Sequence, residues 1–140
     1  LSQYFANLFL AYFDHWLKED MKVRYYYRYA DDMVILSSNK SNLHTLKDEI
    51  RDYLRDVLKL ELKDNWQIFP VGKRGIDFIG YVFYHDHVKM RKRIKKNFFR
   101  FSAILNKRET TEKEKHCALS SWLGWARHCD SRNLIKKILK

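Results

Sequence analysis

The fold is decided by residues 25–36, which read YYYRYADDMVIL. Two runs of aromatic and aliphatic residues flank a pair of adjacent acids, Asp31 and Asp32. Strand-forming residues on both sides of such a pair predict a β-hairpin with the acids at or beside its tip. The second run, from Met33 to Leu36, is apolar at every position and therefore predicts a strand buried on both faces.

The acid pair has two interpretations. Aspartate is frequent in turns because its side chain hydrogen-bonds nearby backbone groups, so the pair can be a turn feature alone. The alternative is a site for Mg²⁺, a hard cation that prefers carboxylate and phosphate oxygens. Two such ions about 3.5–4 Å apart can activate a 3′-hydroxyl and stabilise a leaving pyrophosphate. Since successive strand side chains point to opposite faces, Asp31 and Asp32 need not be equivalent.

The composition indicates a folded chain with a polyanionic partner. With 46% apolar residues, the 140-residue chain can form a core, which excludes disorder throughout. Its net charge of +11 favours a polyanion as partner, although a merely soluble basic protein has the same charge. The two cysteines, Cys117 and Cys129, form no disulfide framework and fit a reducing compartment. No apolar run is long enough to span a bilayer, so we expect no membrane association.

Apolar spacing predicts helices and strands around the hairpin. Residues 2–20 and 41–57 carry apolar side chains at helical intervals, so both segments are predicted to be helices. The predicted buried face of the first helix comprises Tyr4, Phe5, Leu8, Phe9, Tyr12, Phe13 and Trp16. Residues 66–71 predict a short strand that Pro70 places at an edge, and residues 76–84 predict a further strand interrupted at Gly80. Because the chain begins without Met inside a predicted helix, we expect a fragment of a longer protein.

The sequence becomes strongly basic after residue 88. Residues 91–108 contain eight Lys or Arg and no acid, and Ile94, Phe98, Phe101 and Leu105 recur at helical spacing. This pattern predicts an amphipathic helix whose basic face is either a nucleic-acid surface or only solvated. Thr111 and Glu114 resemble a capping box at the start of a further helix. With a last short helix, residues 91–140 are predicted to form a three-helix unit, which makes the whole chain α+β.

Four motifs occur in a recognisable order. They are Ser2-Gln3 with Ala6-Asn7, Tyr29-Ala30-Asp31-Asp32, the GIDFIGY stretch over residues 75–81, and Trp122-Leu123-Gly124-Trp125 with His128-Cys129-Asp130. In this order the chain resembles bacterial retroelement reverse transcriptases of the group II intron and diversity-generating types. The resemblance implies the C-terminal part of a polymerase palm over residues 1–90, containing a YADD hairpin and a primer-grip hairpin. It implies a helical thumb over residues 91–140.

The resemblance also implies an activity and its site. The family consists of RNA-directed DNA polymerases that use two-metal nucleotidyl transfer with Mg²⁺ or Mn²⁺. Partners would be an RNA template with a DNA or RNA primer, deoxynucleoside triphosphates and in some systems an accessory protein, in the bacterial cytoplasm. Asp31 and Asp32 correspond to the catalytic, metal-binding acids, and Gln3 and Ala30 to residues near the nucleotide and template. The primer grip corresponds to Phe78, Gly80 and Tyr81, and the contacts to the nucleic-acid backbone correspond to Lys92, Arg93, Lys95, Lys96 and Arg100.

This sequence departs from the family pattern in two respects. The family's other metal-binding Asp and its nucleotide-holding fingers fall outside these 140 residues, so we expect the chain by itself to be inactive. The place where the family often carries a Lys for proton transfer holds Trp66, and Lys63 is the nearest substitute. The alternatives from other classes are a non-catalytic nucleic-acid-binding module and a phage-defence relative with the same fold.

Overall fold

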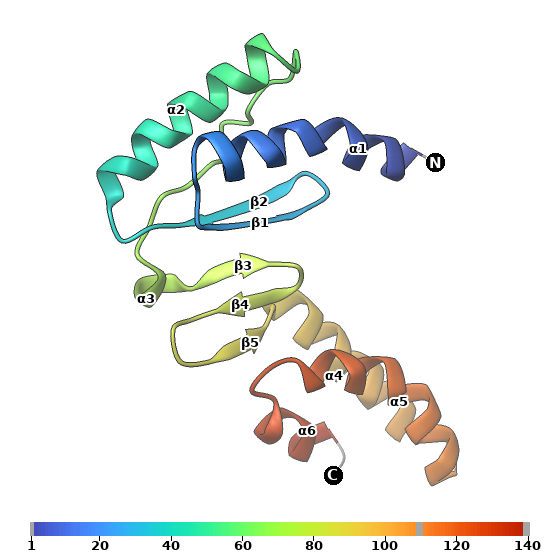
Figure 1. Ribbon diagram of the computed structural model, residues 1–140. Helices are drawn as coiled ribbons and strands as arrows, with labels where there is room; N and C mark the ends of the chain where they lie inside the picture. Colours follow the sequence, from blue (N-terminus) through green and yellow to red (C-terminus); the bar gives the residue numbers. More distant parts are fainter. Residues whose placement is uncertain (1, 109–110, 139–140) are drawn as a thin grey trace. The chain divides into compact units, whose positions relative to one another are not determined.

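The computed structural model describes residues 2–108 and 111–138, with side chains for 4–108 and 111–137. Within these ranges the chain is α+β, as predicted, with six α-helices and two small antiparallel sheets (Figure 1). It divides into two compact units, Leu1–Phe69 and Pro70–Lys140. Of the helices in the described ranges, none combines the length and the apolar character needed to cross a bilayer.

The first unit is a hairpin covered by two helices. Helix α1 (Ser2–His15) continues into a π-helical segment, η1 (Trp16–Asp20). Strands β1 (Tyr25–Tyr29) and β2 (Asp32–Leu36) pair antiparallel with Tyr29 opposite Asp32, so Ala30 and Asp31 form the connecting turn. Helix α2 (Lys40–Asp56) follows, with the Asn39 side chain accepting hydrogen bonds from two backbone N–H groups of its first turn. The predicted hairpin, with acids at its tip, is confirmed.

The hairpin packs one face against the core of the first unit. Phe13 and Leu17 on the α1–η1 side and Ile50 and Leu54 on α2 form the buried core of this unit. Alternate hairpin residues pack on it: Tyr26, Met33 and Ile35. Tyr25, Tyr27 and Tyr29, on the opposite face, are 44%, 52% and 62% exposed. The prediction that the second strand is buried on both faces is wrong, because Met33 to Leu36 are all only half-buried.

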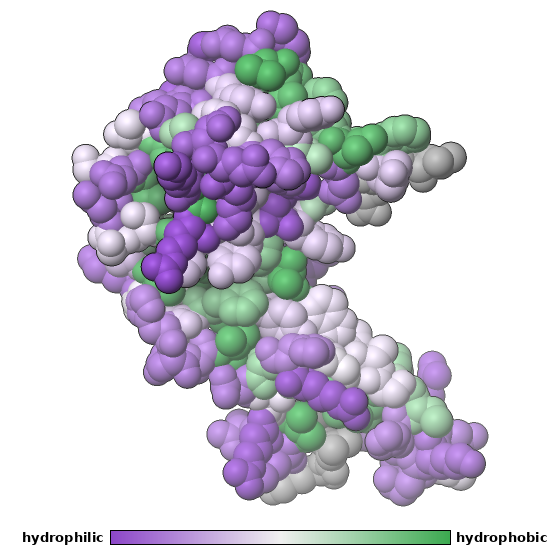
Figure 2. Space-filling model, in the orientation of Figure 1, coloured by the Kyte–Doolittle hydropathy of each residue, from purple (hydrophilic) through white to green (hydrophobic). Residues whose placement is uncertain are grey.

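Half of α1 remains exposed to solvent. We call its apolar side chains that are about half or more exposed the exposed α1 face: Tyr4, Phe5, Leu8, Phe9 and Tyr12. Figure 2 shows hydrophobic side chains gathered over this end of the helix. The wide buried face predicted for residues 2–20 is thus wrong over its first half. Only the second half, with fully buried Phe13 and partly buried Trp16, reaches the core.

The second unit begins with a short helix and a three-stranded meander. Helix α3 (Val71–Arg74) is followed by β3 (Ile76–Phe78), β4 (Tyr81–Phe83) and β5 (Val88–Met90), which pair antiparallel in chain order. The strand predicted over residues 66–71 is wrong, since residues 66–70 have no regular structure and Val71 already begins α3. The strand predicted over residues 76–84 with an interruption at Gly80 is instead a hairpin that reverses at Ile79 and Gly80, and a hairpin in this stretch is what the resemblance implied. β5 was not predicted.

Three helices complete this unit. They are α4 (Lys92–Asn106), α5 (Glu112–Arg127) and α6 (Arg132–Ile138). Their core contains Phe98 and Leu105 of α4 and Leu119 and Ala126 of α5, and the ring of Phe98 stacks on Trp122 at 5.5 Å between ring centroids. The predicted capping box is present: Thr111 and Glu114 each accept a hydrogen bond from the other's backbone N–H. The predicted amphipathic helix with its apolar face inward is likewise confirmed.

Replacement of Phe98 by Ala should destabilise the second unit by about 3–5 kcal/mol, since the side chain is fully buried and its loss leaves a cavity. The matched control is Ile104→Ala on the same helix, where the side chain is 52% exposed. That variant should stay within about 0.5 kcal/mol of the wild type. Urea unfolding followed by circular dichroism measures both. Equal losses of stability in the two variants would contradict this assignment of the core.

Candidate active site

The tip of the β1–β2 hairpin presents two exposed carboxylates. Asp31 lies in the turn, whereas Asp32 begins β2 opposite Tyr29, so the two acids differ in position as predicted. The Lys63 Nζ donates a hydrogen bond to Asp31 Oδ2 at 3.3 Å. A hydrogen bond from its own backbone amide and then the Lys63 ammonium hold the pKa of Asp31 below its ordinary value. Asp31 is therefore ionised at neutral pH.

The donor chemistry at this tip suits Mg²⁺, because Asp31 and Asp32 offer hard carboxylate oxygens. Mg²⁺ demands near-octahedral coordination and keeps several waters when few carboxylates bind it. Within the described side chains, no group of three or more His, Cys, Asp or Glu gathers as a metal cluster. The two tip acids could hold a metal ion together with waters, phosphate oxygens or an acid from elsewhere.

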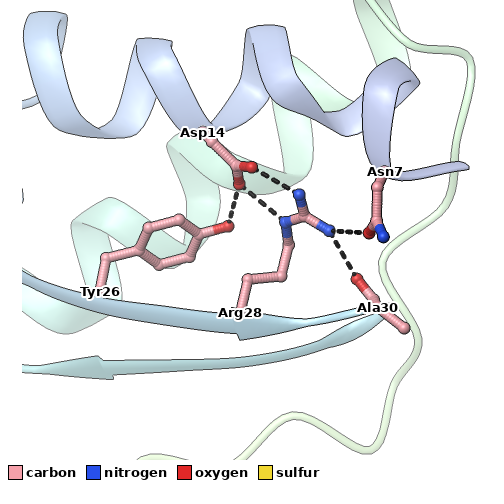
Figure 3. A network of polar contacts seen from close by, with 5 residues as sticks. All are labelled: Asn7, Asp14, Tyr26, Arg28 and Ala30. Atoms are coloured by element: carbon pink, nitrogen blue, oxygen red, sulfur yellow. Dashed lines mark hydrogen bonds and ion pairs between the residues drawn. The ribbon is translucent and has the colours of Figure 1, made fainter. Parts of the chain in front are cut away.

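A network of polar contacts lies directly behind the turn, and we call it the Arg28 clamp: Asn7, Asp14, Tyr26, Arg28 and Ala30 (Figure 3). Arg28 extends from β1 toward α1, where its Nε and Nη2 donate to the two carboxylate oxygens of Asp14 at 2.8 and 2.5 Å. Its Nη1 donates to Asn7 Oδ1 at 2.9 Å and to the Ala30 carbonyl at 3.0 Å. The Tyr26 hydroxyl also donates to Asp14, at 2.6 Å.

Charges in the Arg28 clamp are fixed by this geometry. Burial opposes ionisation of Asp14, but the hydrogen bonds from Arg28 and Tyr26 outweigh it and lower the pKa of Asp14. Burial, followed by the contact with Asp14, raises the pKa of Tyr26 well above its usual range. This network was not predicted from the sequence, although a signal was available. Tyr26 and Arg28 share one face of a predicted strand, and Asn7 and Asp14 lie two turns apart on a predicted helix.

The nucleotide and template residues are only partly described. Ala30 lies in the turn with a φ of 52°, in the left-handed region that non-glycine residues rarely adopt. Gln3 lies within α1, and its side chain is outside the described part of the structure.

The three predicted primer-grip residues lie in or beside the second core. Tyr81 is 8% exposed and donates its hydroxyl to the Trp125 carbonyl at 2.9 Å, and Phe78 is half-buried. A Cβ at Gly80 would lie 2.5 Å from Trp125 Cζ3 and 2.8 Å from Ile94 Cδ1. Glycine is therefore required at this position by packing inside the protein. The expected approach of a phosphate to Gly80 is not needed to explain it.

Ile79 lies at the tip of the β3–β4 hairpin and was not singled out in the sequence. Its φ is 43° and that of Gly80 is 90°, so both residues of this two-residue turn are left-handed. Such turns favour Asn or Gly, and a β-branched residue there is strained. Ile79 is nevertheless 44% exposed. An apolar, strained residue at an exposed tip is the pattern of a contact site more than of a stability element.

The basic face of α4 carries one shallow, open depression. Lys92, Arg93, Lys96, Asn97 and Arg100 line one depression of about 660 Å³, which we call the α4 basic depression. Four of the five predicted backbone-contact residues are thus brought together. The fifth, Lys95, is exposed but does not line the depression. Four cations without an acid among the lining residues make this surface suited to a chain of phosphates.

Replacement of Ile79 by Asn should stabilise the second unit by about 1 kcal/mol, since Asn tolerates a left-handed backbone and Ile does not. The control is Ile104→Asn, at an exposed isoleucine in a helical backbone, which should give no stabilisation. Thermal unfolding of both variants measures the difference. A loss of stability at Ile79 as large as that at Ile104 would show that the turn is unstrained.

No model of a known protein family matches this chain, and no curated protein matches it significantly. The hairpin tip, the Ile79 turn and the α4 basic depression are therefore the observations from which a function follows.

Proposed function

We propose that this chain is the C-terminal palm and the thumb of an RNA-directed DNA polymerase of the bacterial retroelement type. The hairpin tip carries the proposal, because the YADD sequence sets two exposed acids, Asp31 and Asp32, at the end of a turn. A turn that serves no site would not require the hydrogen bond from Arg28 to the Ala30 carbonyl or the one from Lys63 to Asp31. In this assignment β1 and β2 belong to the palm, and α4 begins the thumb.

The tip residues have distinct proposed roles. Metal ions bound there would activate a primer 3′-hydroxyl and stabilise the leaving pyrophosphate. Asp31, ionised at neutral pH, is the principal ligand, and Asp32 is the second. Lys63 is the cation nearest the reacting phosphates in this assignment, since its Nζ contacts Asp31. Trp66 does not take this place, because its indole packs against Lys47, whose Nζ lies 4.6 Å from the ring centroid.

The partners follow from the surfaces. The α4 basic depression would contact the phosphates of a template–primer duplex through shape and charge. The exposed Ile79 tip would meet the primer, with Phe78, Gly80 and Tyr81 supporting it from within the fold. Deoxynucleoside triphosphates would be the substrates, and the pyrophosphate released carries the charge that Lys63 faces.

A second candidate is a nucleic-acid-binding protein without polymerase activity, a class that includes a relative used in phage defence. The four cations that line the α4 basic depression favour it. The α4 basic depression needs no metal to bind phosphates. Both candidates predict binding, and only the first predicts that Asp31 matters for catalysis.

Asp31→Asn should abolish primer extension in a longer protein that contains this chain together with the expected upstream acid. Asn preserves the size of the side chain and removes the charge that holds the ions. The assay is primer extension on an RNA template with Mg²⁺ and the four deoxynucleotides, with folding followed by circular dichroism. The matched control is Asp52→Asn, at an exposed α2 acid in an ion pair with Arg55, which should keep near wild-type extension.

Extension near the wild-type rate by the Asp31→Asn protein would overturn the catalytic assignment and favour the binding module. The 140-residue chain by itself is expected to give no extension. Positioning of the triphosphate supplies most of the catalysis in phosphoryl transfer, and the family's nucleotide-holding fingers fall outside these residues.

Replacing the four cations of the α4 basic depression (Lys92, Arg93, Lys96 and Arg100) by Gln should weaken duplex binding and its salt dependence. For each phosphate that the variant no longer neutralises, the slope of log K against log salt should become shallower by about 0.9 on duplex DNA. Fluorescence anisotropy over a range of salt concentrations measures this with the chain itself. The charge-matched control replaces four exposed cations on α5 and α6 by Gln: Lys113, Arg132, Lys136 and Lys137.

The control should keep most of the slope, because its cations do not line the depression. If the slope becomes equally shallow in both quadruple variants, binding is governed by net charge alone and the depression has no special role.

A further inference from the structure

The turn that carries Asp31 is in a conformation its sequence does not favour. Ala30 has a φ of 52°, and a left-handed backbone is strained for an L-residue other than Gly. A residue stays in such a conformation only when its surroundings impose it. The Ala30 carbonyl accepts a hydrogen bond of 3.0 Å from Arg28 Nη1. This bond reaches the strained residue directly next to Asp31.

Packing alone does not hold the turn. An open depression of about 330 Å³ lies beside it, lined by Asn7, Arg28, Tyr29 and Ala30. Asp31 itself is exposed, and so is Tyr29, at 62%. With open space on one side and solvent on the other, a polar contact to the Ala30 carbonyl has a large share in fixing the backbone.

Arg28 is rigid enough to do this. Its side chain is only 12% exposed, and its planar guanidinium forms a two-point fork with Asp14. The remaining donor atom, Nη1, is shared between the Ala30 carbonyl and Asn7 Oδ1. A guanidinium held at both ends has little freedom to rotate, so the position of its third contact is determined.

Asp14 is anchored in turn. Its Oδ1 also accepts the Tyr26 hydroxyl at 2.6 Å, and it follows Phe13, which is fully buried in the core. A continuous series of contacts therefore runs from the core through Asp14 and Arg28 to Ala30. Helix α1 sets the position of the turn through this series, although the turn itself lies at the exposed end of the hairpin.

We propose that Arg28 is a positioning residue, which holds Ala30, the first residue of the turn, in its left-handed conformation and so places the Asp31 carboxylate. The importance of this for catalysis rests on the proposed function, whereas its effect on the turn does not. The competing interpretation is an ion pair that only stabilises the first unit. The two interpretations differ in whether the amide signals of Asp31 and Asp32 move in a variant whose first unit remains folded.

The test uses Arg28→Lys in the 140-residue chain, a change that keeps the charge and removes the fork. Titration with Mn²⁺ broadens the backbone amide signals of residues near a bound ion. In the wild type the Asp31 and Asp32 signals should broaden first. In the variant the Mn²⁺ concentration for half-broadening should rise about tenfold, as for loss of an outer-shell partner at a metal site. The Asp31 and Asp32 amide shifts should also move before any Mn²⁺ is added.

Two further variants keep the test decisive. Arg51→Lys, at an exposed α2 arginine paired with Asp48, is the matched control and should leave the tip signals and the Mn²⁺ titration unchanged. Asn7→Ala removes one hydrogen-bond acceptor of Nη1 from an exposed position, so the fold should survive even if Arg28→Lys unfolds. It should shift the same tip signals, by a smaller amount.

Unchanged tip shifts in a folded Arg28→Lys or Asn7→Ala chain would overturn the positioning role and leave a stabilising ion pair. The proposed function fails separately, by wild-type extension from the Asp31→Asn protein, and that result would not alter the amide shifts. If both hold, Arg28→Lys in the longer protein should lower kcat more than it raises KM.

Discussion

The ion pair between Asp14 and Arg28 is the interaction on which the first unit depends. It joins α1 to β1 through two parallel hydrogen bonds, and it lies where neither charge is fully hydrated. Loss of one partner would leave the other half-buried and unpaired, which costs more than the pair itself contributes. The fork also defines an angle, so it fixes direction as well as distance. The pair therefore fixes the positions of α1, β1 and the Ala30–Asp31 turn relative to one another.

Local patterns predicted much of the fold. The hairpin over residues 25–36, the α4 amphipathic helix and the Thr111 capping box follow from neighbouring residues, and the structure has all three. Predictions failed where the outcome depends on distant partners. The exposed α1 face has the spacing of a buried one, and periodicity does not say whether a partner is present. Gly80 indicates a break in one strand, but the packing of Trp125 and Ile94 requires a glycine where the chain reverses.

The candidate site was likewise predicted only in part. Asp31 and Asp32 are conspicuous in sequence because adjacent acids between apolar runs are unusual. Arg28 and Ile79 are not conspicuous in the sequence. Arg28 matters through its hydrogen bond to the Ala30 carbonyl, and Ile79 through its backbone φ angle. Neither quantity is encoded in a motif. Residue type pointed to the chemistry at the tip, whereas the means of holding the tip in place became visible only with the α1 contacts.

The exposed α1 face has a consequence for the behaviour of the chain in salt. Contiguous apolar surface favours self-association, and a net charge of +11 opposes it through repulsion between copies. At an ionic strength of 0.15 M the Debye length is about 8 Å, so repulsion over larger separations is largely screened. Added salt should therefore have two opposite effects: it would weaken binding to the proposed polyanion and favour association between copies of the chain. On the proposed function, ionic strength would couple the oligomeric state of the chain to its binding of nucleic acid.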